Sequence, residues 1–341
     1  MRRTCPLRRP TARALAAALG CAELALVGCS APKPSGAPGG PGEAASRFAI
    51  AGVGFQNDQF FKLTELGMKA AADKAGVDIS LGNSAGSLDR EISLVDTYIA
   101  QDKDALVIAP YNQKASLPAL KRAHDSGMKV VTFDSFVDAD FPVSTIRSDQ
   151  VSLGATTGEE AARYIREGMG GKARVAVVTY LSLMPIAAGE RNKGFEEAVR
   201  KLPGVRIVAK QDAWMAEKAV GVVEGILTAH PDVDLIWAAN EGGTVGAVTA
   251  VKNAGLAGKV VVFGTDMSEQ MAGFLLDPAS ILQAVTGQKP FEIGERALET
   301  AVKALKGEPV EKRIALPGLL FTRTRPEEVT KYRDYLRGIA R

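Results

Sequence analysis

Short apolar runs alternate with amphipathic segments of helical length from Arg47 onward. Such alternation is typical of β-α units around a parallel sheet, so it predicts an α/β fold. In residues 88–101, for example, Leu88, Ile92 and Val95 fall on one helix face. We expect a first layer of four strands at 48–55, 77–81, 105–109 and 129–133, with helices at 59–75, 88–101 and 117–126.

The same pattern begins again after residues 144–148. It predicts helices at 151–168, 189–201, 216–229 and 244–254, strands at 174–178, 205–209, 235–238, 260–263 and 281–286, and a further helix from Phe291. The segments 129–134 and 259–266 echo each other, because each is an apolar strand that ends in an aspartate. We therefore expect two similar doubly wound lobes with parallel sheets, joined by a hinge and facing each other across a cleft.

The first 28 residues predict a secretory signal. Residues 1–13 are basic without an acid, 14–27 are mostly Ala and Leu, and small residues follow. The end of this segment, Leu-Val-Gly-Cys29, resembles the lipobox of bacterial lipoproteins, in which the cysteine is lipidated and becomes the new N-terminus. Cys21 offers a poorer competing site, and a cleaved signal with an untouched Cys29 stays open. The Pro- and Gly-rich residues up to 46 predict a flexible tether.

Charge and cysteine content exclude several functions. The formal net charge of the chain is +3, and five of its arginines lie in residues 1–13. Without the first 28 residues the net charge becomes −1, so no nucleic-acid partner is expected. All three cysteines, Cys5, Cys21 and Cys29, precede residue 30, which excludes disulfides and cysteine-zinc sites beyond it. The only histidines are His124 and His230, and Gly52-x-Gly54 lacks the third glycine of a dinucleotide site. We expect no metal, no cofactor and no enzymatic activity.

Polar and aromatic residues gather at the predicted strand ends. They are Asn57, Asp58, Phe60, Phe61, Asp134, Arg191, Trp214, Asn240, Asp266 and Gln288. A neutral polyol presents hydroxyls and apolar C–H faces, which acceptor-only Asp, donor-only Arg, bifunctional amides and flat rings match. Each has another interpretation: one phenylalanine could staple its helix to the sheet, Trp214 could be a core anchor, Arg191 a surface charge, and the aspartates helix or turn caps.

Taken together, these segments resemble the periplasmic sugar-binding proteins of ABC transporters, the group that includes ribose-binding proteins and LacI-type effector domains. The resemblance covers about residues 47–320 and rests on 57–61, 131–134, 189–195, 227–232, 239–241, Asp266 and 287–290. It implies the type I periplasmic binding protein fold, with an N-terminal lobe of residues 47–148 and 289–315 and a C-terminal lobe of residues 149–288 and 316–341. The two lobes would close on one sugar.

The resemblance also implies roles for the candidate residues. By motif position, Phe60 and Phe61 match the aromatics below the sugar ring, and Trp214 matches the aromatic that covers it. The hydroxyl-binding positions are matched by Asp134, Arg191, Asn240, Asp266 and Gln288. Asp58 stands where ribose binders carry an asparagine, and Ser135 where they carry an arginine. These differences change the charge and size of the pocket, so the resemblance implies the sugar class and not ribose itself.

We therefore expect a monomeric substrate-binding lipoprotein of a bacterial ABC sugar importer. Its partners would be a monosaccharide, the permease subunits and, through the lipid on Cys29 only, the periplasmic or extracellular face of the cell membrane. An alternative is a sensing module that presents its ligand to a membrane receptor. A repressor of the related fold is disfavoured, because a secretion signal occupies the place of its DNA-binding domain, and an enzyme is the third alternative.

Overall fold

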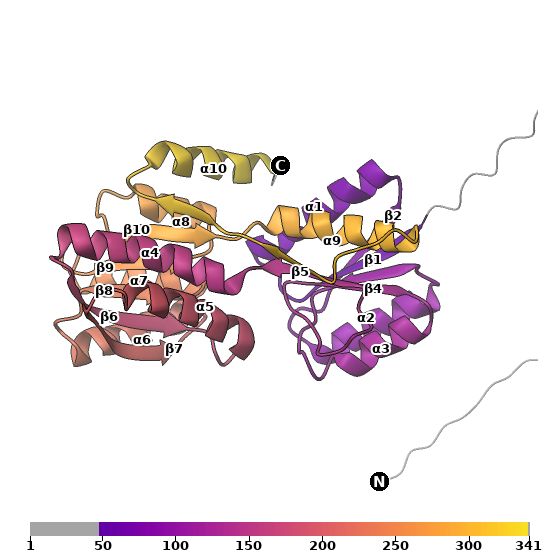
Figure 1. The fold of residues 1–341 in the computed structure, drawn as a ribbon, viewed down its shortest axis with the longest axis horizontal. Coiled ribbons are helices and arrows are strands. Elements are labelled where there is room, and N and C mark those ends of the chain that lie inside the picture. The colour runs from indigo at the N-terminus through magenta and orange to yellow at the C-terminus, as the bar shows by residue number, and fades with distance from the viewer. Residues whose placement is uncertain (1–47, 340–341) are drawn as a thin grey trace, which may run out of the picture. The chain divides into compact units, whose positions relative to one another are not determined.

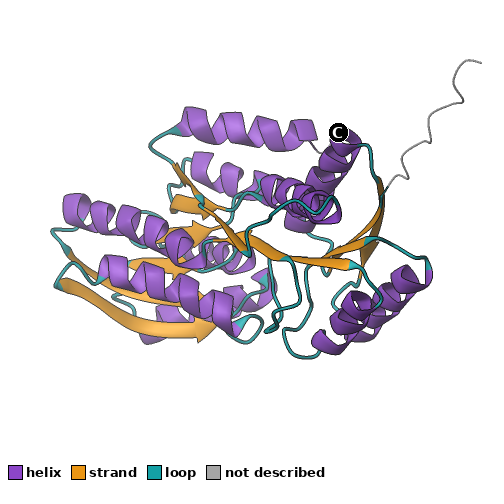
Figure 2. Ribbon diagram, turned by 45° about the vertical axis from the view of Figure 1, so that its right-hand side comes forward, coloured by secondary structure: helices purple, strands orange, loops and turns teal. Residues whose placement is uncertain are grey.

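Two α/β lobes, each built on a six-stranded sheet, form the computed structural model, which describes residues 48–339 (Figure 1). The predicted signal at 1–28, the lipidation site Cys29 and the tether up to residue 46 lie outside the described residues. Helices cover both faces of each sheet (Figure 2). The predicted fold class, two similar lobes with parallel sheets, is confirmed.

The sheet of the first lobe has the strand order β11-β5-β4-β3-β1-β2, and all its pairs are parallel. Its strands are β1 (Ala49–Gly54), β2 (Asp78–Asn83), β3 (Ala105–Ile108), β4 (Lys129–Phe133), β5 (Ser144–Ser148) and β11 (Arg313–Leu316). The sequence predicted four strands for this sheet. That number was too small by two, because β5 and β11 extend the sheet. The helices are α1 (Gln59–Ala75), α2 (Leu88–Ala100), α3 (Leu117–Asp125) and α9 (Pro290–Leu305).

The second sheet has the order β12-β10-β9-β8-β6-β7. Its strands are β6 (Lys172–Thr179), β7 (Gly204–Asp212), β8 (Leu235–Ala238), β9 (Val261–Thr265), β10 (Leu282–Gly287) and β12 (Leu319–Thr322). Only β12 runs antiparallel to its neighbour, which is an exception to the expected parallel pattern among the described strands. The helices are α4 (Gln150–Gly168), α5 (Pro185–Val199), α6 (Ala216–Ala229), α7 (Glu241–Asn253), α8 (Glu269–Leu276) and α10 (Pro326–Ile339).

Three segments of the described chain cross between the lobes. They join β5 to α4, β10 to α9 and β11 to β12, and they lie side by side in Figure 1. Because β5 and β10 both run toward the other lobe, the carboxyl ends of the parallel strands in both sheets face the gap between the lobes. The fold thus brings together the two sheet edges at which open α/β sheets bind their ligands.

Several helix ends differ from the predictions, and their caps explain why. Helix α5 begins at Pro185, four residues before the predicted start, because proline suits the first turn of a helix. Helix α7 begins at Glu241 because the Asn240 side chain accepts a hydrogen bond from the Gly243 amide. Helix α8, which was not predicted, is capped in the same way by Ser268, which accepts from the Met271 amide.

A pair of glycines fixes the closest helix contact in each lobe. In the first lobe, a Cβ atom on Gly67 of α1 would lie 2.0 Å from the carbonyl oxygen of Phe291, and one on Gly294 of α9 would lie 2.0 Å from that of Thr64. In the second, a Cβ on Gly154 of α4 would lie 1.9 Å from the oxygen of Arg191. A Cβ on Gly194 of α5 would lie 2.1 Å from that of Val151. Each helix pair therefore packs backbone against backbone, which leaves no room for a methyl group.

We expect Gly194→Ala to lower the free energy of unfolding by about 1–3 kcal/mol or more, because the added methyl group must push α5 away from α4. The matched control is Gly189→Ala in the same helix, where a Cβ meets no atom within 4 Å. The control should be neutral or stabilising by up to ~1 kcal/mol, since alanine favours helix. Urea unfolding followed by circular dichroism measures both. Equal midpoints for the two variants would contradict the packing described above.

Candidate functional site

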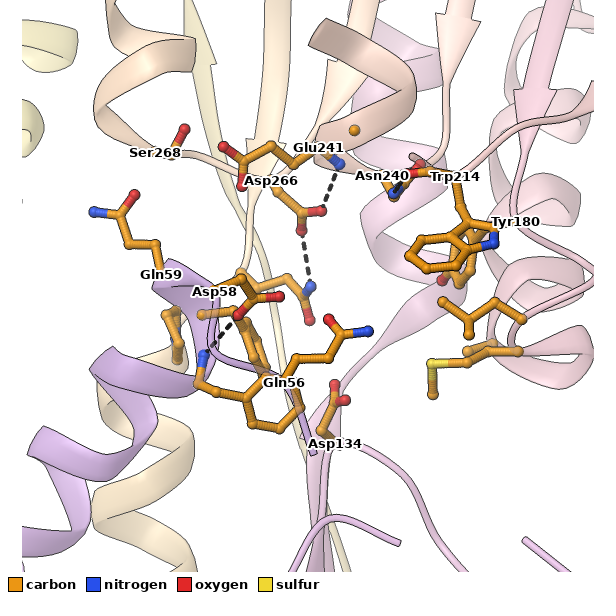
Figure 3. A pocket seen from close by; sticks show the side chains of 18 of the residues that line it. Gln56, Asp58, Gln59, Asp134, Tyr180, Trp214, Asn240, Glu241, Asp266 and Ser268 are labelled. Carbon is orange, nitrogen blue, oxygen red and sulfur yellow. Dashed lines mark hydrogen bonds between the residues drawn. The ribbon is translucent and has the colours of Figure 1, made fainter. Parts of the chain in front are cut away.

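A cleft of about 500 Å³ lies between the lobes (Figure 3). Ligand pockets of small molecules commonly have volumes of ~300–1,000 Å³, so the cleft is large enough for a small polar molecule. The first lobe contributes the start of α1 and the end of β4, and the second contributes the loops that follow β6, β7, β8 and β9. Nine candidate residues line it: Asp58, Phe60, Phe61, Asp134, Arg191, Trp214, Asn240, Asp266 and Gln288.

Two aspartates occupy equivalent positions at the ends of β4 and β9. The amide of Asp134 donates to the carbonyl of Ile146 on the next strand (2.9 Å), and that of Asp266 donates to Thr286 in the same way (2.9 Å). Both residues then adopt the left-handed conformation, with φ of 57° and 73°. This conformation is costly for a non-glycine residue and is least so for Asp and Asn. In both lobes the chain thus turns so that a carboxylate points into the cleft (Figure 3).

Asp266 is held by a chain of hydrogen bonds that reaches two of the segments crossing between the lobes. Its Oδ2 accepts from the amide of Glu241 (3.0 Å) and its Oδ1 from Nε2 of Gln288 (2.8 Å). The Oε1 of Gln288 in turn accepts from the hydroxyl of Ser148 (2.7 Å). Asp266 therefore partly caps α7, as one interpretation of the sequence had it, and it also lines the cleft. In contrast, no hydrogen bond within residues 48–339 reaches the carboxylate of Asp134.

Arg191 is a buried part of the cleft wall, with only 3% of its surface exposed, so the alternative of a surface charge is wrong. Its Nε and Nη2 donate to Oε1 of Gln150, the former at 2.9 Å, and its Nη1 donates to the carbonyl of Ala239 (2.6 Å). The guanidinium carbon lies 5.2 Å from the ring centroid of Tyr180. These contacts fix the guanidinium plane and leave two of its five N–H groups for other acceptors.

The aromatic candidates fall into two groups. Phe61 is 3% exposed and packs on Phe55, with ring centroids 4.6 Å apart, so it joins α1 to the core of the first lobe. This is the stapling role that the sequence left open for one phenylalanine. Phe60 and Trp214 are half-buried and line the cleft from different lobes. In Figure 3 the Trp214 ring lies beside Tyr180 on the side of the second lobe.

Two candidates, Asn57 and Ser135, do not line the cleft. Asn57 is exposed ahead of α1, and Ser135 is buried in a tight turn in which its amide donates to the carbonyl of Phe133. Their ligand-binding role stays a prediction. Asn240 lines the cleft, but its Oδ1 caps α7 and its Nδ2 donates to the carbonyl of Trp214 (2.8 Å), so much of its bonding capacity serves the protein.

Several polar residues of the cleft were not identified from the sequence. They are Gln56, Gln59, Gln150, Tyr180, Glu241, Ser268 and Gln270. A usable signal existed for Glu241, because it follows Asn240 at the end of a predicted strand. For Gln150 no local signal existed, since its role depends on Arg191, 41 residues further along the chain.

Crowded carboxyl groups change the acidity of the cleft. Burial raises the pKa of Asp134 to about 7; Arg191 and Arg147 oppose this rise, and Asp58 and Asp266 add to it. Burial likewise raises the pKa of Glu241 to about 7, helped by Asp266 and Asp58 and opposed by the Ser268 hydroxyl. The pKa of Asp58 is also raised, mainly by desolvation and further by Asp266. At neutral pH the cleft therefore holds carboxyl groups that are only partly ionised.

We expect Asp134→Asn to remove a pH dependence of stability. In the native state the Asp134 carboxyl keeps its proton up to a pKa of about 7, whereas in the unfolded chain it loses it near ~4. The native state thus binds more protons in between, so the free energy of unfolding falls as pH rises from about 4 to 7. Asparagine tolerates the left-handed backbone, so the variant should gain stability over the wild type at pH 8 and little at pH 4.5.

Urea unfolding at both pH values measures this gain. Asp102→Asn is the matched control, because Asp102 has a similar left-handed backbone (φ 50°) on the exposed surface. A gain for Asp134→Asn that is equal at both pH values would refute a raised pKa at this site.

Residues 48–339 contain neither a metal-binding cluster nor a membrane-spanning helix. No group of three His, Cys, Asp or Glu side chains in this range is arranged to hold a metal ion. No helix within it is both long and apolar enough to cross a membrane.

Comparison with known proteins places the chain in a family. Residues 48–309 match the family model described as periplasmic binding protein domain. The ribose import binding protein RbsB of Escherichia coli is 32% identical over 256 residues, which cover 75% of this chain and 83% of that protein. The ABC transporter periplasmic-binding protein YphF of Escherichia coli is 28% identical over 289 residues, with 82% and 88% covered.

A solved structure supports the same assignment. The periplasmic solute binding protein of an ABC transporter from Actinobacillus succinogenes, with bound D-allose, has a TM-score of 0.75 at 25% identity and covers 83% of this chain and 100% of that one. Proteins of this family bind solutes and are not enzymes, so the expectation of a non-enzymatic protein is confirmed. The chain therefore belongs to the periplasmic binding protein family with the type I fold, beside the sugar-binding proteins of ABC transporters.

Proposed function

We propose that this protein is the substrate-binding lipoprotein of a bacterial ABC importer and that it closes on one monosaccharide-sized molecule. One observation carries the proposal: the cleft presents aromatic faces from both lobes, Phe60 and Trp214, together with fixed polar groups such as Arg191. Rings that cover the apolar faces of a sugar, with charged groups at its rim, are the complement of a polyhydroxylated ring.

In this proposal different polar groups of the cleft bind different hydroxyls of the ligand. Asp134 and Asp58 accept hydrogen bonds, and Arg191 donates through the two N–H groups that the protein leaves free. The hydrogen bonds from Glu241 and Gln288 orient Asp266 without covering every lone pair of its carboxylate. A hydrogen bond to a charged group contributes ~1.5–3 kcal/mol, and micromolar affinity requires about 8 kcal/mol, so a few such bonds and two ring contacts suffice.

Closure follows from the position of the site between two lobes that share three connecting segments. A ligand that contacts both lobes at once is bound fully only when the lobes approach, so it shifts the equilibrium toward the closed form. The permease subunits of the importer would recognise that closed form. No covalent step is involved.

Lipid attachment at Cys29 is the second part of the proposal. Membership of the family implies an exported, periplasmic protein. The motif Leu-Val-Gly-Cys29 supports an anchor, with the Pro- and Gly-rich residues 30–45 between the lipid and β1. Such an anchor would hold the binding lobes near the permease and raise their effective concentration at the membrane.

The relatives narrow the choice of ligand only to a class. A relative binds D-ribose and D-allose, and similar solved structures hold D-allose and D-arabinose, so monosaccharides are the first probes for this chain. Asp58 and Ser135 differ from the pattern of ribose binders, so we propose a sugar other than ribose.

We expect Trp214→Ala to weaken binding by roughly 2–4 kcal/mol with little loss of fold, because it removes the ring with which the second lobe covers the ligand. A thermal-shift screen of D-ribose, D-allose, D-arabinose, D-galactose and D-glucose selects the probe, since a ligand that binds only the folded state raises Tm. Calorimetric titration then gives Kd. Tyr335→Ala is the control, because Tyr335 is 47% exposed on α10, outside the cleft. Wild-type affinity in Trp214→Ala would show that the ring does not contact the ligand.

We expect Cys29→Ser to release the protein from the membrane, because serine lacks the thiol that carries the lipid. Fractionation of cells that express the full chain, followed by detergent extraction of the membranes, measures the release. Cys21→Ser is the matched control and should stay in the membrane fraction. Membrane attachment that persists in Cys29→Ser and is lost in Cys21→Ser would move the anchor to Cys21.

A further inference from the structure

The charges on the cleft wall do not balance. Of the described residues that line the cleft, four are acidic and one is basic: Asp58, Asp134, Glu241, Asp266 and Arg191. No lysine of the described chain belongs to this lining. When all these groups are ionised, the wall has an excess of three negative charges.

Neighbouring cations do not make up the difference. Arg147 lies near Asp134, but its Nη2 donates to both carboxylate oxygens of Glu190, at 2.9 and 3.1 Å, so this pair adds no net charge. Lys62 is exposed on α1, and its positive charge lowers the pKa of Asp58. Within residues 48–339, no lysine or arginine forms an ion pair with any of the four cleft carboxylates. The excess therefore stays inside the cleft.

The hydrogen-bonding groups show the same imbalance. Arg191 donates three of its five N–H groups to Gln150 and Ala239. The carboxylate of Asp134 receives no hydrogen bond from the described chain, although its backbone is held in a left-handed conformation that points it into the cleft. Among the charged groups of the wall, acceptors thus outnumber donors. A ligand that matches it is rich in donors and carries positive charge.

A neutral sugar does not supply that charge. Its hydroxyls can donate to the carboxylates, but closure of the lobes would then remove several ionised groups from water without an opposite charge, which is costly. A protonated amine provides three N–H donors, no acceptor and one positive charge. It also interacts favourably with the faces of Phe60 and Trp214, since cations bind over aromatic rings.

We propose that the preferred ligand is a monosaccharide-sized polyol with a protonated amine, that is, an amino sugar or amino polyol, whose ammonium group lies among Asp58, Asp134, Glu241 and Asp266. This proposal rests on the proposed function, because it uses the same cleft, and it narrows the substrate class. Hydroxyls of the ligand would then face Arg191 and the amide side chains of the wall.

Release of protons when the ligand binds is a second observable consequence of the proposal. Asp134, with Arg191, Arg147, Asp58 and Asp266 around it, is partly protonated at neutral pH, and so is Glu241, which faces Ser268, Asp266 and Asp58. An ammonium group favours their ionised forms, so its binding releases protons to the solvent. Affinity for an aminated ligand should therefore rise between pH 5 and pH 6.5, where the amine itself stays protonated.

The test is calorimetric titration of residues 30–341, which lack the predicted signal and Cys29, with matched pairs of probes at pH 6.5, where the amines of the probes are themselves protonated. The pairs are D-glucosamine with D-glucose, D-galactosamine with D-galactose and D-mannosamine with D-mannose. N-acetyl-D-glucosamine controls for the size of the substituent, because it carries no charge. We expect at least one amine to bind ten-fold or more tightly than its neutral partner, with proton release that is detected by repeating the titration in buffers of different ionisation enthalpy.

Asp58→Asn tests the charge directly. Its amide oxygen can still cap α1, as the Asp58 carboxylate does by accepting from the Phe61 amide (3.0 Å), so the fold should be retained. We expect the preference for the amine to fall about ten-fold. The matched control is Asp149→Asn, which likewise keeps a helix cap, on the Ser152 amide (3.0 Å), outside the cleft lining. That variant should keep the wild-type preference.

The outcomes separate this proposal from the proposed function. If a neutral sugar binds as tightly as its amine or more tightly, or if Asp58→Asn leaves the preference unchanged, the amine is wrong and the sugar importer stands. If none of the neutral or aminated probes, nor the five sugars of the thermal-shift screen, binds at millimolar concentration, the proposed sugar-binding function falls, and the amine with it.

Discussion

The direction of the strands is the constraint on which the rest of this structure depends. In both sheets the parallel strands end at the edge that faces the other lobe, and the chain crosses between the lobes at the ends of β5 and β10. Loops after the strands and the first turns of the helices therefore meet in one place. The cleft needs no special segment of its own, because its wall consists of what each β-α unit presents at its carboxyl end.

This regularity explains how much of the fold the sequence could predict. Segments with strong periodicity and clear ends agree residue for residue with the structure, namely 59–75, 129–133, 216–229 and 235–238. The unpredicted strands are less regular. Strand β11 is short and half-exposed and pairs with β5, more than 160 residues away in sequence, as in the pair Arg313 and Thr145. Hydrophobic periodicity carries no information about such a distant partner, which decides whether four residues become a strand.

The residues of the site likewise differ in whether the sequence could identify them. Asp134 and Asp266 could be found because a polar residue directly after a buried strand lies at the sheet edge, wherever the other lobe sits. Gln150 and Tyr180 could not be assigned roles, because their roles arise from contacts with Arg191, which lies far away in the sequence. The charge of the cleft is likewise a property of the assembled wall. A count over the chain gives nearly equal numbers of acids and bases, and only folding concentrates four carboxyl groups around one guanidinium.

The glycine contacts between helices have a consequence for how the two halves can move. Helix α4 starts where the chain leaves β5 and is locked to α5, while α9 starts where the chain leaves β10 and is locked to α1. Two of the connecting strands thus lead directly into a helix that cannot slide against its neighbour. In the closure proposed above, bending would therefore be confined to a few peptide units near residues 148–150, 287–290 and 317–318. Each lobe would then move as a rigid unit about these short connections, so a small displacement beside a bound molecule would become larger at the far rim, where another protein could detect it.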